Sequence, residues 1–169
     1  LVQNRSFEFD KIDRWDYHGF TAWEKSERLE WEIRTAEPLN KENTHYVHIT
    51  SGKGASLYNL GYNTGIYVEE GKQYDFSVFA RGKEGTKIKV SVVDADGICY
   101  TEENDSTIVE LKNRDTQAGW EKYELMLTAV KTTTAGRLKL TFEEETECDL
   151  DMISLFPQDT FLGKRGGLR

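Results

Sequence analysis

Hydrophobic and polar residues alternate with a period of two through much of this chain. The segment QYDFSVFAR, at residues 73–81, is the clearest example, because every second residue from Tyr74 to Ala80 is apolar. Its other face carries Asp75, Ser77, Phe79 and Arg81. Such alternation predicts a β-strand with one face toward a core and one face toward solvent.

Further short segments follow the same rule, among them LEWEIR, HYVHIT, TKIKVSVVD, STIVEL, WEKYELMLT, GRLKLTFE and CDLDMISLF. Turn sequences such as EEGK, GKEG, DADG and TTTAG separate them, and no stretch has the pattern of an amphipathic helix. Many short antiparallel strands predict an all-β fold, an antiparallel β-sandwich of the jelly-roll type. We expect the sandwich to occupy residues 1–156, with an aromatic-rich loop over residues 10–28 and a polar junction segment at 157–169.

Composition limits the expected partners. The chain has 169 residues and a net charge of −8, whereas phosphate binding requires a basic face, so nucleic acid is not expected. The charge gives no attraction to an anionic membrane, and no apolar run approaches the roughly 20 residues that span a bilayer. The chain starts without methionine, which suggests a processed or trimmed start. The lack of a leader therefore says nothing about the compartment.

Catalytic motifs are not apparent in the sequence. No serine lies in a G-x-S-x-G elbow, and neither cysteine has a histidine nearby in the chain. His45 and His48 would point to opposite faces of one strand, which disfavours a shared metal ion. The sequence DADG lacks the ligands of a calcium loop and is better explained as a hairpin turn. Cys99 and Cys148 are either a disulfide or two buried free thiols.

Three segments carry a resemblance to a known family. The first is SLYNLGYNTGIYVEEGKQYDFSVFARG at residues 56–82, and the others are LVQNRSFEF at the start and DMISLFPQDTFLGKRGGLR at the end. Together they resemble α-L-arabinofuranosidases of glycoside hydrolase family 51. In that family the first segment lies in a β-sandwich module similar to carbohydrate-binding families 4, 9 and 22. The final run is the joint that leads to the catalytic (β/α)8 barrel.

The resemblance implies a non-catalytic module, because the family's catalytic glutamates belong to the barrel. It implies a carbohydrate-binding role on arabinose-decorated plant polysaccharide or oligosaccharide, with the catalytic barrel of the same parent chain as a second partner. The alternative is a structural accessory domain that packs on the barrel and binds no sugar. The family also implies a secreted or periplasmic protein.

Exposed aromatic side chains on polar strand faces are the candidates for sugar stacking. Phe79 meets this test best, with Arg81 as a donor to sugar hydroxyls, although Phe79 can also belong to a second small core. Tyr58, Asn59 and Tyr62 lie in the segment that resembles the family, where a structural role is the other reading. Trp23 lies in the N-terminal loop, where aromatic residues either line a binding cleft or anchor the loop. Trp31 and Trp120 are expected in the core.

A structural calcium ion is also implied by the resemblance, since modules of this type often bind one between the first and last strands. The matching ligands are Glu8 and Asp151. Backbone oxygens near residues 40–43, including Asn43, complete the expected shell. Hard oxygen ligands of this kind suit calcium, whereas the alternative for Glu8 is a pair with a cation such as Arg5.

Overall fold

The structure is a computed structural model that describes residues 1–3, 5, 7, 22–61, 65–112 and 119–158. Its strands are β1 (Trp23–Lys25), β2 (Leu29–Arg34), β3 (Tyr46–Ser51), β4 (Ser56–Asn59), β5 (Ile66–Val68), β6 (Gln73–Gly82), β7 (Lys87–Val93), β8 (Ile108–Glu110), β9 (Glu121–Thr128), β10 (Thr133–Phe142) and β11 (Thr146–Pro157). The described residues include the short 3-10 turn η2 (Asp105–Thr107), and no helix among them is long and apolar enough to cross a bilayer.

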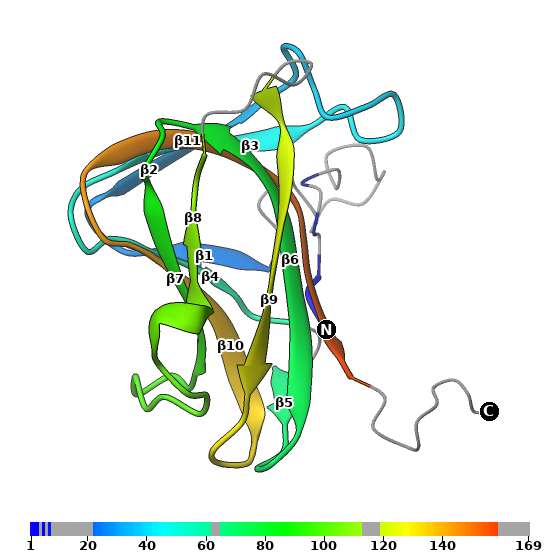
Figure 1. Cartoon of the computed structure of the whole chain (residues 1–169), viewed down its shortest axis with the longest axis vertical. Helices are drawn as coiled ribbons and strands as arrows, with labels where there is room; N and C mark the ends of the chain where they lie inside the picture. Colours follow the sequence, from blue (N-terminus) through cyan, green and yellow to red (C-terminus); the bar gives the residue numbers. More distant parts are fainter. Residues whose placement is uncertain (4, 6, 8–21, 62–64, 113–118, 159–169) are drawn as a thin grey trace.

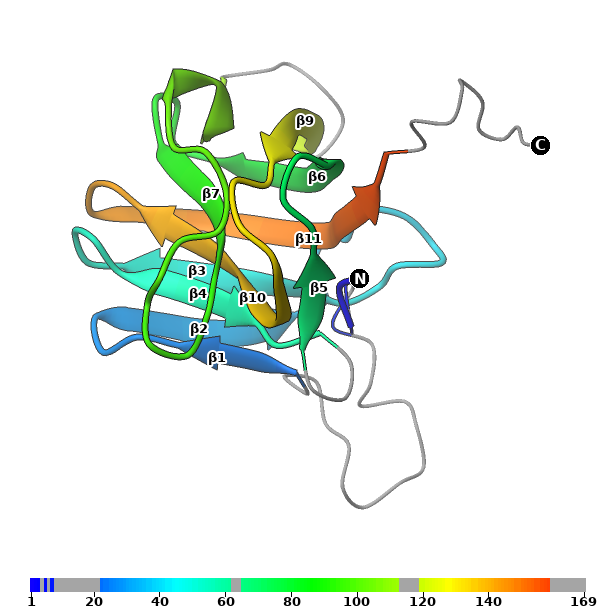
Figure 2. The ribbon, with the colours of Figure 1, turned by 90° about the horizontal axis from the view of Figure 1, so that it is seen from below.

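The strands form two antiparallel sheets, and the expected jelly-roll sandwich is confirmed (Figures 1 and 2). One sheet has five strands in the order β2-β3-β11-β6-β9. The other has six, in the order β1-β4-β10-β7-β8, with β5 paired to β10. Neighbours in each sheet come from distant parts of the chain, as when β3 and β6 both pair with β11. Strand β1 lies within the segment that the sequence predicted to be loop.

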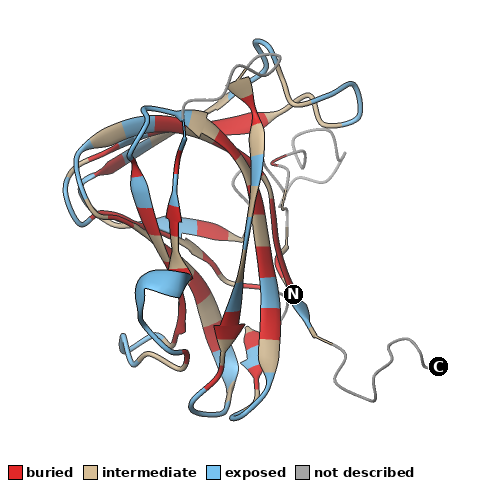
Figure 3. Ribbon diagram, viewed as in Figure 1, coloured by how far each residue is buried: buried red, intermediate tan, exposed pale blue. Residues whose placement is uncertain are grey.

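The core lies between the two sheets and is built by the alternation in the sequence. In β6 the four apolar residues expected inside, Tyr74, Phe76, Val78 and Ala80, are all at most 4% exposed. Figure 3 shows buried and more exposed residues alternating along this strand. Phe142 of β10 and Leu150 of β11 are completely buried in the same cluster. Burial of apolar surface between the layers supplies the main stabilising free energy of such a fold.

A β-bulge in β11 changes which of its residues face the core. The register against β6 shifts between Asp151 and Ser154, and Met152 takes a left-handed conformation with φ 49°. The extra residue keeps Ile153 and Leu155 pointing inward after Leu150, so that the apolar set stays buried. Because of this shift Phe156, which uninterrupted alternation from Cys148 and Leu150 would place on the core face, is 51% exposed.

The first residues of the chain lie beside the end of β11 (Figures 1 and 2). The terminal amine of Leu1 donates to the carbonyl of Leu155 at 3.1 Å, and the Ile153 amide donates to the Arg5 carbonyl at 3.1 Å. These bonds place Arg5 next to the bulge and next to Phe156.

Both cysteines are free, so the disulfide considered from the sequence does not form. Cys148 points into the core and is 2% exposed, while Cys99 is half-buried. Burial raises the pKa of the Cys148 thiol far above its usual range, with smaller contributions from the charges of Asp149 and Glu147. The Cys148 thiol is therefore a packing group without nucleophilic character.

Candidate functional site

A groove crosses the outer face of the five-stranded sheet. Its volume is about 570 Å³. We call it the β6 groove, and it is lined by Arg5, Asp75, Phe76, Ser77, Lys122, Glu124, Leu125, Met126, Ser154, Phe156 and Gln158. Two of its apolar side chains are well exposed, Phe156 at 51% and Met126 at 41%. An aromatic and apolar floor among hydroxyl, amide and charged groups is the composition expected of a site for a polar organic ligand.

Phe79 lies beside this groove on the outer face of β6, as its position in the sequence predicted. It is half-buried, and its cross-strand partners are Asp151 of β11 and Lys122 of β9. The Lys122 ammonium is 5.9 Å from the centre of the Phe79 ring. Phe79 is therefore not part of the core between the sheets, and its role as a stacking platform stays a prediction.

Arg81 has partners within the protein, and its predicted role as a donor to sugar stays a prediction. Its Nε is 2.7 Å from an Asp149 carboxylate oxygen, and an Nη donates to the Ala36 carbonyl at 3.2 Å. The guanidinium carbon also lies 4.4 Å from the ring centre of Trp120 and 5.0 Å from that of Tyr46. With a side chain only 14% exposed, Arg81 fastens the β2–β3 loop to the sheet.

Trp120 is buried, as the sequence predicted, and it packs against this anchored loop just before β9 begins. Its indole nitrogen donates to the Glu37 carbonyl at 3.1 Å, and the ring is 7% exposed. The Tyr46 hydroxyl donates to the Ala36 carbonyl at 2.6 Å, and the Tyr46 and Trp120 rings meet edge to face. The outer face of the five-stranded sheet thus has a second small core at the end beyond Phe79.

The predicted binding residues do not all lie on one surface. Tyr58 is half-buried on the outer face of the six-stranded sheet, where the Lys139 ammonium is 5.8 Å from its ring centre. Phe79 is on the outer face of the other sheet, so the two aromatic rings cannot contact one bound sugar. Tyr62 lies outside the described residues.

Asn59 and Trp23 are interior residues, which corrects their assignment to a binding surface. Trp23 is 5% exposed and stacks on Phe7, with ring centres 5.1 Å apart. Asn59 is fully buried: its amide donates to the Gln3 carbonyl at 2.8 Å, and its oxygen accepts from the amides of Gln3 and Gly61. The asparagine of the family-like segment therefore ties the N-terminal residues to β4.

Gly65 has a steric role in the same segment. Its φ of +134° is unfavourable for other residues, and a Cβ there would lie 2.9 Å from the Ala135 backbone. A Cβ on Gly136 would likewise lie only 2.8 Å from the carbonyl oxygen of Ile66. The two glycines let β5 approach β10 closely, so this part of the motif serves the fold.

A second hollow, of about 410 Å³, lies on the outer face of the five-stranded sheet next to Arg81. His48 is held there between two carboxylates, with Nδ1 2.6 Å from Asp149 and Nε2 2.7 Å from Glu147. Asp149 thus joins His48 to Arg81. The side chains of His48, Arg81, Glu147 and Asp149 therefore contact one another across this hollow and connect β3, β6 and β11.

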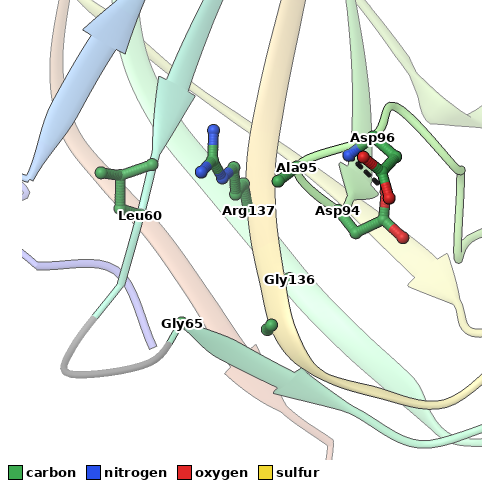
Figure 4. A pocket seen from close by; sticks show the side chains of 8 residues that line it. Leu60, Gly65, Asp94, Ala95, Asp96, Gly136 and Arg137 are labelled. Carbon is green, nitrogen blue, oxygen red and sulfur yellow. Dashed lines mark hydrogen bonds between the residues drawn. The ribbon is translucent and has the colours of Figure 1, made fainter.

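A third hollow, of about 380 Å³, lies at one end of the six-stranded sheet (Figure 4). It is lined by Leu60, Gly65, Asp94, Ala95, Asp96, Ala135, Gly136 and Arg137. Asp94 accepts the backbone amides of Asp96 and Ile98 at 2.9 and 3.0 Å and the Tyr100 hydroxyl at 2.8 Å. Its carboxylate closes the DADG turn, in agreement with the hairpin-turn interpretation of that sequence.

The expected calcium ligands are only partly described. Asp151 is fully buried at the bulge, where a carboxylate oxygen accepts the Met152 amide at 2.9 Å. The Asn43 side chain donates to Asn40 at 3.0 Å, and Glu8 lies outside the described residues. The described part of the chain contains no group of three or more histidine, cysteine or acidic residues that could hold a metal. Asp151 alone does not make a calcium shell, and the site stays a prediction.

Sequence reasoning missed three groups of the β6 groove. Arg5, Met126 and Phe156 were not candidates, because β9 was expected to be simply amphipathic and β11 to continue its alternation without interruption. The exposed Met126 was visible in the sequence as an apolar residue at a solvent-facing position of WEKYELMLT. The contact between Arg5 and Phe156 joins the two ends of the described chain and had no local signal.

The chain is similar in sequence to known proteins. Residues 1–148 match the family described as "Carbohydrate binding domain". An extracellular exo-α-L-arabinofuranosidase of Streptomyces chartreusis is 39% identical over 169 residues, which is 100% of this chain and 19% of that protein. α-L-Arabinofuranosidase 2 of Arabidopsis thaliana is 31% identical over 111 residues, or 65% of this chain and 16% of that protein. The chain thus spans about a fifth of the length of these relatives.

Solved structures share its fold. An arabinose-bound MgGH51 α-L-arabinofuranosidase superposes with a TM-score of 0.75 and 19% identity, over 93% of this chain and 26% of that one. The CBM22-1–GH10 modules of Clostridium thermocellum xylanase 10B, solved with xylohexaose, give a TM-score of 0.58 and 17% identity over 82% of this chain and 26% of that one. At these identities the similarity shows a shared sandwich architecture.

Proposed function

The chain belongs to the carbohydrate-binding domain family, and we propose that it is the sugar-binding module of an α-L-arabinofuranosidase that acts on arabinose-decorated plant polysaccharide. The family makes it a binding domain and not a catalytic one. The identity of 39% along the whole chain to an arabinofuranosidase supports this parent enzyme. That relative is described as extracellular, which supports secretion of the parent protein.

The observation that carries the proposal is the β6 groove with Phe79 at its side. Sugars offer apolar C–H faces to aromatic rings and hydroxyls to planar polar groups, and this surface combines both. Ser77, Glu124 and Gln158 supply polar groups around Phe156 and Met126. The open groove suits a polysaccharide chain, which has to pass across a site without entering a closed cavity.

Affinity electrophoresis tests this function directly. The isolated chain is run through native gels containing arabinoxylan, arabinan, xylan or β-glucan. We expect retarded migration on an arabinose-bearing polysaccharide, and about tenfold weaker binding for Phe79→Ala because a ring contact is lost. Tyr67→Ala is the matched control, since Tyr67 is 48% exposed on β5, in the other sheet. Unchanged migration of the wild type on every polysaccharide would refute the proposal.

A second function is favoured by one feature of the same face. Phe156 and Met126 are the most exposed apolar side chains of the groove, and Phe156 lies near the end of β11. A structural module would use such side chains to pack on a catalytic domain of the same parent chain. In that case the wild type binds no polysaccharide, and Phe156→Ala lowers the melting temperature of the parent enzyme while the isolated module is unaffected.

A further inference from the structure

We propose that the Arg5 end of the β6 groove is a subsite for one uncharged sugar ring, which stacks beside Phe156 and joins Arg5 to Asp75 through neighbouring hydroxyls. This inference rests on the proposed function and specifies the chemical class of the ligand. It names neutral pentose or hexose units, as opposed to uronic acids, as the sugars that the groove takes.

Arg5 presents a planar guanidinium at this end of the groove. Its guanidinium carbon lies 5.5 Å from the centre of the Phe156 ring, and one Nη donates to the Ser154 hydroxyl. The Nε is buried and has no hydrogen-bond partner, and no acidic side chain of the described residues forms an ion pair with Arg5. A ligand hydroxyl would therefore meet the parts of the planar guanidinium that line the groove, beside the Phe156 ring.

Asp75 supplies the complementary acceptor. It is the cross-strand partner of Phe156 in the pairing of β6 with β11, and its side chain is exposed. One carboxylate oxygen accepts the side-chain amide of Gln158 at 3.3 Å, a long bond that leaves the other oxygen open. A donor and an acceptor therefore flank one exposed aromatic ring. A sugar diol, in which each hydroxyl both donates and accepts, matches this arrangement.

The charges in the groove favour a neutral ligand over an anionic one. Lys122 and Glu124 form an ion pair at 3.4 Å and offset each other. Arg5 and Asp75 remain, one positive and one negative, so the groove has no excess of positive charge. The chain as a whole carries a net charge of −8, which repels a polyanion at low salt. A uronic acid placed against Arg5 would also meet the Asp75 carboxylate.

Binding of the isolated module to three probes tests the inference: neutral arabinoxylan, neutral linear arabinan and anionic polygalacturonate. We expect retention on a neutral polysaccharide that changes less than about twofold between low and moderate salt, because no net charge is neutralised. No retention on polygalacturonate is expected. Arg5→Lys, Asp75→Asn and Phe156→Ala should each weaken binding about tenfold, with Arg5→Lys keeping the charge while losing the planar donor pair.

The possible outcomes separate this inference from the proposed function. If Phe79→Ala weakens binding but the Arg5, Asp75 and Phe156 variants bind within about twofold of wild type, the subsite is wrong and the function stands. Tighter retention on polygalacturonate than on the neutral probes also overturns it. If the wild type binds no polysaccharide, both fail. Phe156 and Asp75 are exposed, so these variants should fold, and equal melting temperatures confirm it.

Discussion

Asp94 shows how one carboxylate stabilises a whole turn. Its two oxygens accept two backbone amides of residues 96–98 and the hydroxyl of Tyr100. The hydrogen bond from Tyr100 is the largest cause that lowers the pKa of Asp94 below its usual value of 3.8, ahead of the opposing effect of desolvation. The folded state therefore favours the ionised carboxylate, and this contribution depends on pH.

The sign of that dependence follows from the lowered pKa. The stabilisation is complete above the unfolded-state pKa near 4 and is lost as pH falls through the lower pKa of the folded state. We expect Asp94→Asn to lower the melting temperature at pH 6 and to reduce its decline between about pH 4 and pH 2. Thermal melts across this range measure both. Asp96→Asn, in the same turn, is the control; an acid decline identical in wild type and Asp94→Asn would contradict the argument.

Arg81 illustrates the limits of assigning roles residue by residue. Its position on the outer face of β6 was correctly predicted, because a strand has a period of two. Its partners come from the β2–β3 loop, from β11 and from the start of β9, which are distant in sequence. Alternation fixes the face on which a side chain lies, and it contains no information about which loop covers that face.

At the scale of elements, the anchored β2–β3 loop is the feature that sets the limit of the open surface. Ala36 and Glu37 give their carbonyls to Tyr46, Arg81 and Trp120, and Glu37 takes a left-handed conformation with φ 52°. These contacts hold the loop over one end of the five-stranded sheet. The groove is consequently confined to the part of the sheet between Phe79 and Phe156.

Weakening this anchor should loosen the loop without disrupting the sandwich. Arg81→Lys keeps the charge but loses the planar fork between the two rings, so we expect the free energy of unfolding to fall by about 1–2 kcal/mol. Urea unfolding gives that value, and amide hydrogen exchange should speed up at residues 35–37. Arg34→Lys is the matched control, because Arg34 is an exposed partner of Glu32. If Arg81→Lys were as stable as Arg34→Lys, the contacts of Arg81 with the β2–β3 loop would contribute nothing to the free energy of unfolding.

The bulge in β11 is the second decisive element. One inserted residue turns Phe156 outward, and Asp151, at the start of the bulge, is fully buried. The sequence CDLDMISLF predicts one regular strand only if this insertion is ignored. Met152 takes the left-handed conformation at the bulge, and a methionine at that position gives no sequence signal for it. The exposed ring of the groove therefore depends on a local irregularity of one strand.

At the scale of the whole molecule, the sandwich brings the N-terminal residues against the last strand. Leu1 and Arg5 bond to the backbone of β11, and Gln3 bonds to Asn59 of β4. These bonds connect the N-terminal residues to an inner strand of each sheet. The buried Asp151 lies in the same region, where the predicted calcium ion would hold the first segment to the last.

Removal of calcium tests that prediction. We expect a chelator to lower the melting temperature of the wild-type module by several degrees, since bound calcium stabilises only the folded state. Added calcium should restore the original value. Asp151→Asn should be insensitive to chelator and calcium alike, while Asp149→Asn, a neighbouring carboxylate bound to His48 and Arg81, should still respond. A wild-type melting temperature that chelator does not change excludes the ion.

The sequence by itself determined the fold class, most of the longer strands and the face of each regular strand, because alternation with a period of two is a local property that the chain displays directly. It also fixed the DADG turn and the outward position of Phe79. Only the tertiary structure decided that Tyr58 and Phe79 lie on opposite surfaces, that Asn59 and Trp23 are interior, and that Arg5 meets Phe156. These facts depend on strand order and on one bulge, and both result from long-range pairing that no local pattern encodes.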